Sequence, residues 1–324
     1  MWSSILSMFS LLLIISTLLP FHNSKKWWVR NFDFPRLQIF LVSIVTLMLF
    51  LITDSLNHWT IYIIFSLLIL VALYQGYKIL PYTVFYSKQV KDSNAHEESL
   101  SLITANVQKC NKQVEKCISM IKTYKPDLVL LLEVDQWWVS QLDEVISNYP
   151  YQVSHPLENT YGMLLLSRFE LVNPEIKFLI TSEVPSIHTY VKPAKEQNFK
   201  LICLHPIPPT PPAADGNNDS VERDVELLKV AEMVAKTNEP TIVLGDLNDV
   251  AWSKTTCEFQ ATSRLLDPRQ GRGMFNSFNA KYFFLRFPLD HIFNSAHFRC
   301  KALKRLKTIG SDHFPIYIQM SQKR

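Results

Sequence analysis

The sequence lacks several features that define other protein classes. None of its five cysteines forms a CxxC pair, which argues against a structural zinc site. Their odd number and wide spacing argue against a disulfide framework, so we expect buried free thiols. The formal net charge is only +4, and no run of basic residues is interleaved with aromatic ones. A dedicated nucleic-acid-binding surface is therefore not expected.

A cleaved secretory signal peptide is not expected, because no basic stretch precedes the first apolar segment and no small-residue cleavage pattern follows it. Instead, residues 1–80 contain three apolar segments, 2–19, 37–53 and 59–77. Each is near the about twenty residues that a membrane-spanning helix needs. Tryptophans lie at the ends of these segments, as interfacial aromatic residues do. We expect three transmembrane helices that form a membrane anchor.

Basic residues predict the orientation of this anchor. They flank the first connection and follow the third segment, whereas the N-terminus and residues 54–58 contain no Lys or Arg. Positively charged connections usually stay in the cytoplasm. The prediction is an external N-terminus and a cytoplasmic domain, with export of the domain as the alternative. The basic residues concerned are Lys25, Lys26, Arg30, Arg36, Lys78, Lys88 and Lys91.

The rest of the chain has the mixed composition of a soluble domain. Residues 81–99 carry mixed charge and suggest a juxtamembrane linker, and residues 100–321 form the predicted domain. Apolar runs typical of strands cover 100–107, 128–132, 161–167, 171–180, 187–191 and 199–204, and another begins at Thr241 and breaks at Gly245. Residues 287–293 lead into a further strand, and 314–318 are expected to form a closing strand. Helices are expected from about residue 114, over 136–146 and over 221–236. Between them, five prolines within 206–212 predict a semi-rigid loop.

The run that begins at Thr241 delivers two polar side chains, Asp246 and Asn248, directly after Gly245. In an extended segment these side chains share one face. A carboxylate and an amide at a strand end can orient a water, bind a metal or donate to a phosphoryl oxygen. Taken alone, however, the same residues are commoner in an ordinary turn.

Other apolar runs end in the same way. The polar residues at or near their ends are Asn106, Glu133, His205, Asp290, Asp312 and His313. Acidic residues at strand ends are usually only solvated. This set, however, combines hard oxygen ligands with imidazoles, which are the groups that metal-assisted hydrolysis of phosphate esters requires.

At these residues the sequence resembles the endonuclease/exonuclease/phosphatase superfamily, over roughly residues 100–321. The resemblance rests on ordered motifs, of which Gly245-Asp246-Leu247-Asn248 and Ser311-Asp312-His313-Phe314-Pro315 are specific as a pair. It implies an α/β four-layer sandwich of two packed β-sheets. Nearby features, such as the prolines after His205, resemble a bacterial membrane-anchored branch. The implied location is the bacterial inner membrane, with a periplasmic domain as the alternative to a cytoplasmic one.

The resemblance also implies a role for each residue. Glu133 would bind a divalent cation with help from Asn106, and Asp312 is a further candidate ligand. The favoured ion is Mg²⁺, with Mn²⁺ as the alternative, because a hard cation suits few carboxylates plus a substrate phosphate. The catalytic set comprises Asp246 for the attacking water, Asn248 for phosphoryl oxygens, His313 for the scissile phosphate, Asp290 to orient His313, and His205 for the leaving group.

The predicted activity is therefore metal-dependent hydrolysis of phosphate esters, most simply phosphodiesters, at a membrane. A nuclease and a catalytically silent scaffold are the alternatives, and no obligate protein partner is indicated. The sequence departs from the family pattern at Leu132, where a Gln is usual, and at His291, which we interpret as structural. Arg168 is open between phosphate binding and a structural ion pair, and Arg223 and Arg272 are speculative candidates.

Overall fold

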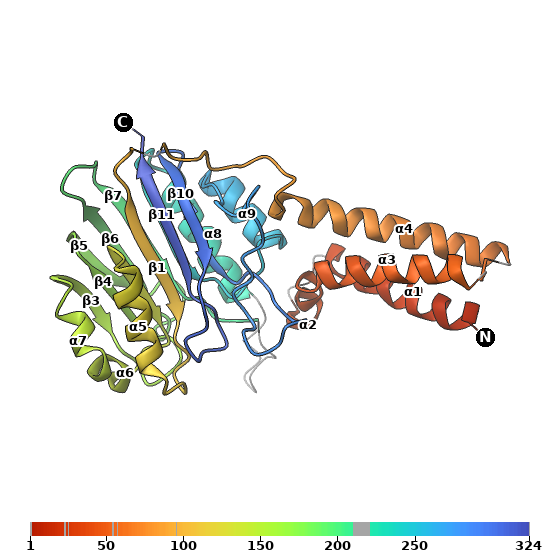
Figure 1. Ribbon diagram of the computed structural model, residues 1–324, viewed down its shortest axis with the longest axis horizontal. Helices are drawn as coiled ribbons and strands as arrows, with labels where there is room; N and C mark the ends of the chain where they lie inside the picture. The colour runs from red at the N-terminus through yellow and green to blue at the C-terminus, as the bar shows by residue number, and fades with distance from the viewer. Residues whose placement is uncertain are drawn as a thin grey trace.

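A bundle of three long helices projects from an α/β domain (Figure 1). The computed structural model describes residues 2–22, 24, 26–53, 55–56, 58–94, 96–209 and 221–323. The bundle helices are α1 (Trp2–Leu18), α3 (Arg36–Ile52) and α4 (Trp59–Ile79). They pack through a small apolar core of Leu6, Ile39, Phe50, Leu68 and Val71.

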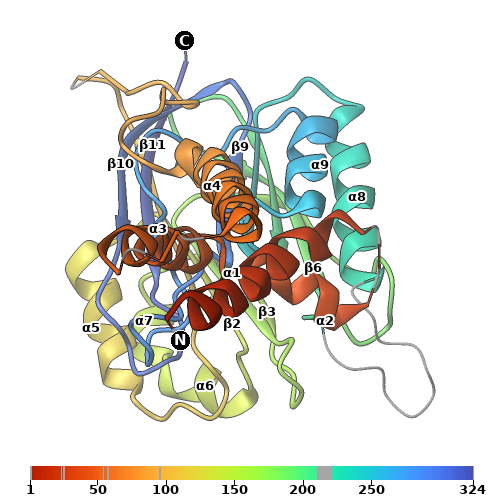
Figure 2. The ribbon, with the colours of Figure 1, turned by 90° about the vertical axis from the view of Figure 1, so that its right-hand side faces the viewer.

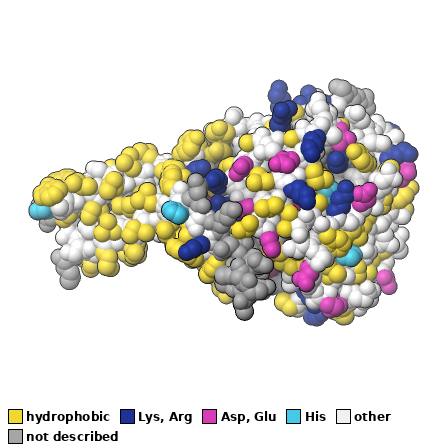
Figure 3. Space-filling model, turned by 180° about the vertical axis from the view of Figure 1, so that it is seen from behind, with side chains coloured by type: hydrophobic (Ala, Val, Ile, Leu, Met, Phe, Trp, Pro, Cys, Tyr) yellow, Lys and Arg dark blue, Asp and Glu magenta, His cyan; other side chains and the backbone are white. Residues whose placement is uncertain are grey.

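The outer surface of this bundle is apolar. On the face seen in Figure 3, most of the coloured side chains of the bundle are hydrophobic, whereas the surface of the α/β domain mixes charged and apolar groups. Two helical stretches, Trp2–Phe21 and Trp59–Tyr82, are long and apolar enough to cross a membrane. A third span requires that Trp27–Asp33 and Arg36–Ile52, which meet at a bend of 63°, count as one. Two or three of the expected spans are thus present as apolar helices.

The bundle meets the domain at a neck, which we define as residues 19–36 and 79–86. The first segment contains short turns of helix, η1 (Leu19–Phe21), α2 (Trp27–Arg30) and η2 (Asn31–Asp33). The second contains η3 (Leu80–Tyr82), after which residues 87–94 run along the domain. Several contacts hold this region to the domain: Tyr82 is buried and donates to the Ala251 carbonyl at 2.7 Å, and Val90 is also buried.

The domain contains two β-sheets. The first has the order β10-β11-β1-β2-β4-β3, and the second has the order β5-β6-β7-β8-β9. Each contains one parallel pair, β1 with β2 and β7 with β8, while the other neighbours are antiparallel. The strands are β1 (Leu100–Asn106), β2 (Leu128–Leu132), β3 (Tyr151–His155), β4 (Met163–Ser167), β5 (Glu170–Lys177), β6 (Ser186–Lys192), β7 (Phe199–Leu204), β8 (Thr241–Asp246), β9 (Asp290–Asn294), β10 (Phe298–Arg305) and β11 (Ile316–Gln322).

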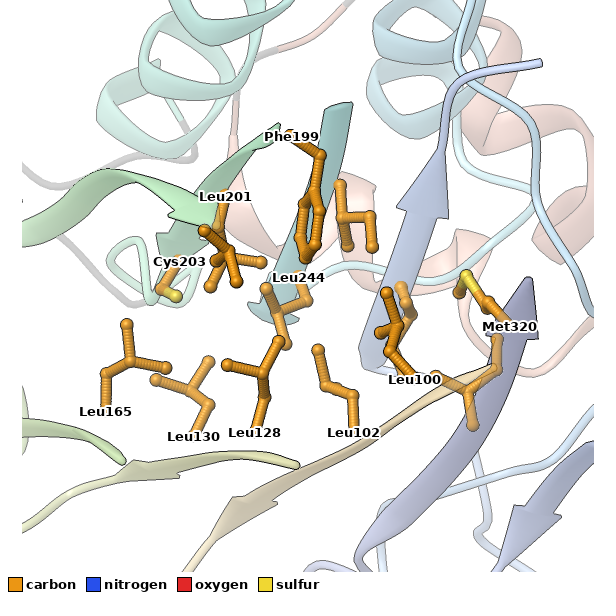
Figure 4. Close-up of a cluster of buried hydrophobic side chains, with 14 of the residues drawn as sticks. Leu100, Leu102, Leu128, Leu130, Leu165, Phe199, Leu201, Cys203, Leu244 and Met320 are labelled. Atoms are coloured by element: carbon orange, nitrogen blue, oxygen red, sulfur yellow. The ribbon is translucent and has the colours of Figure 1, made fainter. Parts of the chain in front are cut away.

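Helices cover both outer faces of the paired sheets, which gives four layers (Figure 2). On the first sheet lie α5 (Val114–Tyr124), α6 (Gln136–Gln141) and α7 (Asp143–Ile146), and on the second lie α8 (Val221–Ala235) and α9 (Lys254–Ser263). The main core lies between the sheets, where leucines of β1, β2 and β4 face Phe199, Leu201 and Leu244 (Figure 4). The β2 run Leu128–Leu132 is buried throughout, as a strand covered on both faces must be. The predicted four-layer sandwich of two packed sheets is confirmed.

Some local predictions were wrong. The helix expected over 136–146 is two short helices, because the helical geometry breaks at Leu142. Strand β3 was missed because its exposed edge leaves a single buried side chain, Val153. All five cysteines are free, as expected, but Cys110 and Cys257 are exposed, since Cys110 lies in a turn and Cys257, in α9, lines an open pocket beside the neck.

Candidate active site

In the first sheet, two neighbouring parallel strands end at the site. Asn106 is the last residue of β1 and is in register with Leu132, the last residue of β2. Glu133 follows in the left-handed region, with φ 61°, so the chain turns sharply and carries its carboxylate across the strand end. The Asn106 amide donates to Glu133 Oε1 at 2.8 Å, and the Lys109 backbone N–H donates to Oε2 at 3.2 Å.

The second sheet brings two carboxylates to the same edge. Asp246 ends β8 and pairs in register with Asp290, which begins the antiparallel strand β9. Both side chains are buried. The Asn106 amide also donates to Asp246 Oδ2 at 3.2 Å, so one side chain joins the ends of the two sheets.

His313 lies just before β11 and faces both carboxylates. Its Nδ1 donates to Asp290 Oδ2 at 2.7 Å, and its Nε2 is 3.5 Å from Asp246 Oδ2. Burial alone would lower the pKa of this imidazole, but Asp290 and Asp246 outweigh burial and raise the pKa to about 10. His313 is therefore a cation at neutral pH.

His205, the residue after β7, is neutral, unlike His313. It is buried, and desolvation lowers its pKa despite the Asp246 carboxylate 3.8 Å from its Nε2. Its Nδ1 has no hydrogen-bond partner among the described residues. The ring of Tyr161 lies 5.5 Å from the ring of His205, centroid to centroid. The site thus holds one neutral and one charged imidazole, a separation of roles that environment alone creates.

Asn248 reaches the site edge by a route that strand alternation does not describe. The strand ends at Asp246, and Asn248 adopts a left-handed φ of 51°. The expectation that both side chains share one face of an extended segment was therefore wrong. The Asn248 side-chain amide donates to the Pro206 carbonyl at 2.9 Å, and the Asn248 backbone carbonyl accepts from the buried Arg223 at 2.8 Å. Arg223 thus stabilises the turn through a hydrogen bond to its backbone.

Asp312 lies beside the site and accepts from Gln108 Nε2 at 3.0 Å. Gln108 and Phe278, whose ring is 4.9 Å from the ring of His313, were not anticipated. No sequence signal marked them, because both lie in loops that only the tertiary fold brings to the strand ends. Tyr161 was missed for the same reason.

Three residues singled out in the sequence lie away from the site. Arg168 is exposed and stacks over the Tyr149 ring at 5.6 Å, and Arg272 pairs with Asp92 at 2.6 Å. His291 is buried under the site, between Arg269 Nη2 at 2.6 Å from its Nδ1 and the Asp249 carbonyl at 2.8 Å from its Nε2. Burial and Arg269 hold its pKa well below the usual value, so His291 is a neutral structural residue.

The charges in the site fit a divalent cation. Within the described part of the chain, no Lys or Arg forms an ion pair with any of its four carboxylates, Glu133, Asp246, Asp290 and Asp312. Burial raises the pKa of Glu133 and Asp246, which is the cost of negative charge without a compensating cation. Carboxylate and amide oxygens are hard donors of the kind that Mg²⁺, Mn²⁺ or Ca²⁺ takes.

The arrangement of these donors favours one side of the site. Ligand atoms of Asp246, Asp290 and His313 all lie within 4.8 Å of one another. A protonated His313 has no free lone pair, however, and Asp290 is already engaged with it. The oxygens of Glu133 and Asn106, next to Asp246, are therefore the better donor set for a metal.

A buried carboxylate, a charged imidazole and a candidate cation site at one edge are the groups that hydrolysis of a phosphate ester requires. A family model described as Endonuclease/Exonuclease/phosphatase family matches residues 103–313. The chain belongs to the endonuclease/exonuclease/phosphatase family. The matched span contains every predicted site residue, from Asn106 to His313. Members of the endonuclease/exonuclease/phosphatase family are metal-dependent hydrolases of phosphate esters, and so is this chain.

Solved structures share this family fold. A zebrafish (D. rerio) TDP2 complexed with single-strand DNA product is 20% identical, with a TM-score of 0.57, and the match covers 70% of this chain and 100% of that one. The human Nocturnin catalytic domain with bound sulfate is 18% identical, with a TM-score of 0.54, over 69% and 95% of the two chains.

A bacterial protein of the endonuclease/exonuclease/phosphatase family, from Beutenbergia cavernae, is 16% identical, with a TM-score of 0.54, over 69% and 72% of the two chains. At these identities the likeness establishes the fold alone. No curated protein sequence matches this chain.

Proposed function

We propose that this chain is a membrane-anchored phosphodiesterase that uses a divalent metal and cleaves its substrate by in-line attack of water. The observation that carries the proposal is the hydrogen bonding of Asn106 to both Glu133 and Asp246, which joins the metal-binding and base-bearing strand ends. Residues 1–80 are the proposed anchor, 81–99 its connection and 100–321 the catalytic domain. The anchor is proposed to lie in a bacterial inner membrane with the domain in the cytoplasm.

The proposed metal site consists of Glu133 and Asn106, with Asp312 as a further ligand, and Mg²⁺ is the proposed ion. When bound, the cation would stabilise negative charge on the phosphate oxygens and make the phosphorus more electrophilic. Asp246 orients the water and takes its proton, and the raised pKa of this buried carboxyl suits it to that transfer. The water oxygen bonds to phosphorus as the bond to the leaving oxygen breaks.

Two imidazoles and an amide act on the phosphate. The His313 cation faces its oxygens and stabilises the charge that builds up in the transition state, with Asp290 holding the ring in position. Asn248 has a second amide N–H, beyond the one bound to Pro206, for a phosphoryl oxygen. Neutral His205 can donate an N–H to the leaving oxygen, which favours a diester over a monoester.

The proposal predicts the effect of two substitutions on hydrolysis. The full chain, purified in detergent, should hydrolyse bis(4-nitrophenyl) phosphate with Mg²⁺ and lose that activity with a chelator. Asp246→Ala and His313→Ala should each lower kcat by about a thousandfold, as expected when a general base or a charged stabiliser is removed. His155→Asn, on the edge strand β3, is the matched histidine control and should retain activity. Unchanged turnover in both site variants refutes the assignments.

A nuclease is the second candidate, since the similar zebrafish structure holds a single-strand DNA product. Plasmid DNA and RNA therefore belong in the same assay. Faster Mg²⁺-dependent cleavage of nucleic acid than of lipid or the small diester favours this second candidate.

A further inference from the structure

A cluster of exposed aromatic residues lies in the loop between Phe278 and Phe287. The exposed fractions of Tyr282, Phe283, Phe284 and Leu285 are 62%, 71%, 80% and 53%. We call residues 279–286 the aromatic loop. Consecutive large apolar side chains at such exposure are unusual on a soluble domain and mark a surface that binds something apolar.

The aromatic loop is held to the neck on one side. The Gln38 amide, in the first turn of α3, donates to the Phe284 carbonyl at 2.7 Å. The ring of Phe34 packs edge-on against the ring of Phe287, with centroids 5.5 Å apart. The loop therefore lies at the depth where the apolar bundle begins, beside the domain and not on its far side.

Other exposed apolar side chains occupy the same depth. They belong to both segments of the neck and to the adjoining end of α4, and they are Phe21, Trp28, Tyr77, Leu80, Val84 and Phe85. At the opposite end of the bundle, Trp2 and Trp59 are also exposed. Aromatic residues at both ends of spanning helices are typical of the two interfaces of a bilayer. The aromatic loop extends this group of exposed apolar residues from the neck outward, beside the catalytic domain.

On its other side the loop adjoins the candidate active site. Its base is closed by paired backbone hydrogen bonds between Phe278 and Phe287, and the Phe278 ring lies 4.9 Å from that of His313. Lys281 Nζ donates at 3.2 Å to Gln108, which in turn donates to Asp312. The exposed apolar surface of the loop is thus only a few residues from the proposed phosphate-binding groups.

The cations of the loop complement a lipid surface. Lys281 flanks the exposed aromatics on one side and Arg286 on the other, with the Arg286 guanidinium 5.1 Å from the Phe283 ring centre. Basic residues beside interfacial aromatics attract anionic headgroups. A nucleic-acid duplex, which presents its phosphates outward, would leave the four apolar side chains in water, and the bases of a single strand could stack on the three rings but not on Leu285. A bilayer interface buries all four.

We propose that the aromatic loop inserts into the interface of the membrane that anchors this chain, and that the site beside it takes the phosphodiesters of lipid headgroups. The second part rests on the proposed phosphodiesterase function, whereas the first part rests only on the proposed membrane anchor.

Insertion can be tested without any assay of activity. The photoreactive residue p-benzoylphenylalanine is placed at Phe283 of the full chain, which is reconstituted in vesicles of phosphatidylcholine and phosphatidylglycerol. The control position is Phe178, an exposed phenylalanine directly after β5, and Figure 1 shows β5 on the side of the domain away from the bundle. Irradiation should give a lipid adduct, read by mass spectrometry, at position 283 and not at 178. Equal adducts at both positions, or none at 283, overturn the insertion.

The substrate is tested by changing the loop. The variant Phe283→Ser with Phe284→Ser should lower the ratio of vesicle-lipid turnover to bis(4-nitrophenyl) phosphate turnover by about tenfold or more, since two apolar anchors are lost. Phe178→Ser should leave the ratio within about twofold, as expected of an isolated surface change. Thermal unfolding checks that each variant is folded. An unchanged ratio in the loop variant contradicts the proposal.

Two further outcomes separate the parts of the proposal. A wild-type chain that forms the lipid adduct but hydrolyses neither lipid, diester nor plasmid DNA contradicts the proposed function and leaves insertion supported. DNA turnover that exceeds lipid turnover and falls in the loop variant contradicts the lipid substrate and identifies the loop as a nucleic-acid contact.

Discussion

The active site and the neck both bury charge, but they balance it differently. In the neck, Asp33 pairs with Arg36, and Arg30 donates to Thr255 at 2.6 Å and lies 3.7 Å from Asp224. In the site, the described carboxylates have only imidazoles as ionic partners. We interpret the difference as one between structural and functional charge. The paired groups of the neck hold parts of the fold together, whereas the site carboxylates, which lack a Lys or Arg partner, are suited to binding a cation and a substrate.

The segment after β8 belongs to both regions. Asp249, directly after Asn248, is buried, lies 3.5 Å from Arg223 and accepts from Ser253 at 2.6 Å. Three residues later, Trp252 Nε1 donates to the Asp33 carbonyl of the neck at 2.8 Å. One short stretch of chain thus connects the catalytic turn to the proposed membrane anchor.

The largest effect on stability is expected when the arginine that pairs with a buried carboxylate is removed. Arg223→Met leaves the Asp249 carboxylate buried without its arginine and should lower the free energy of unfolding by about 3 kcal/mol. The matched change Arg272→Met removes a pair whose Asp92 partner is more than half exposed, and should cost less than about 1 kcal/mol. Thermal unfolding of both variants in detergent measures the difference. Equal losses would mean that burial does not decide what these pairs contribute.

Addition of a cation tests the other half. Mg²⁺ at about 100 times its dissociation constant should stabilise the native chain by about 2.7 kcal/mol, because it binds only the folded site. Glu133→Gln should abolish this gain by removing a charged donor, whereas Asp92→Asn, at an acid already paired with Arg272, should keep it. The readout is the shift of the melting temperature with Mg²⁺ and its reversal by EDTA. A full shift in the Glu133→Gln variant contradicts the proposed ligand.

Glu226 is a third kind of buried ionisable group, and it lies outside both the active site and the neck. It lies in α8, its Oε1 has no hydrogen-bond partner among the described residues, and burial raises its pKa to about 7. The folded state therefore holds a proton that the unfolded state loses from about pH 4.5 upward, so stability falls as pH rises from there to about pH 7 and then levels off. Glu226→Gln should remove this loss, which amounts to about 2 kcal/mol between pH 5 and pH 8.

The measurement for Glu226 is thermal unfolding of the native and Glu226→Gln chains at pH 5, 6.5 and 8. The gap between them should widen with pH in favour of the variant. A gap that stays constant shows that this carboxyl titrates normally, which would place it in contact with water or a cation.

The sequence predicted the site better than the neck. Runs such as Leu128–Leu132 reveal buried strands, and a polar residue after each run reveals where an edge of the sheet opens. The positions of Glu133 and Asp246 follow from that rule. The direction of Asn248 does not, because a left-handed residue ends the alternation that the prediction assumed.

The neck depended on contacts between residues far apart in the chain. Arg30 and Arg36 were used in the sequence only as charges that orient a membrane anchor, yet both are buried in ion pairs. The partners of Arg30 include Asp224 and Thr255, about 200 residues later. No periodicity or motif reports such a pairing, and the same holds for Phe278 on His313.

The pairing of β1 with β11 has a consequence for how the protein is made. Leu100 pairs with Met320, so β1 waits for a partner that leaves the ribosome about 220 residues later. At ordinary rates of synthesis that delay is about 10 to 40 s, during which one edge of β1 stays open. His313 lies just ahead of β11, so the last component of the site arrives with the strand that closes the sheet. The enzyme should therefore acquire its fold and its activity together, with no active form before β11 has been synthesised.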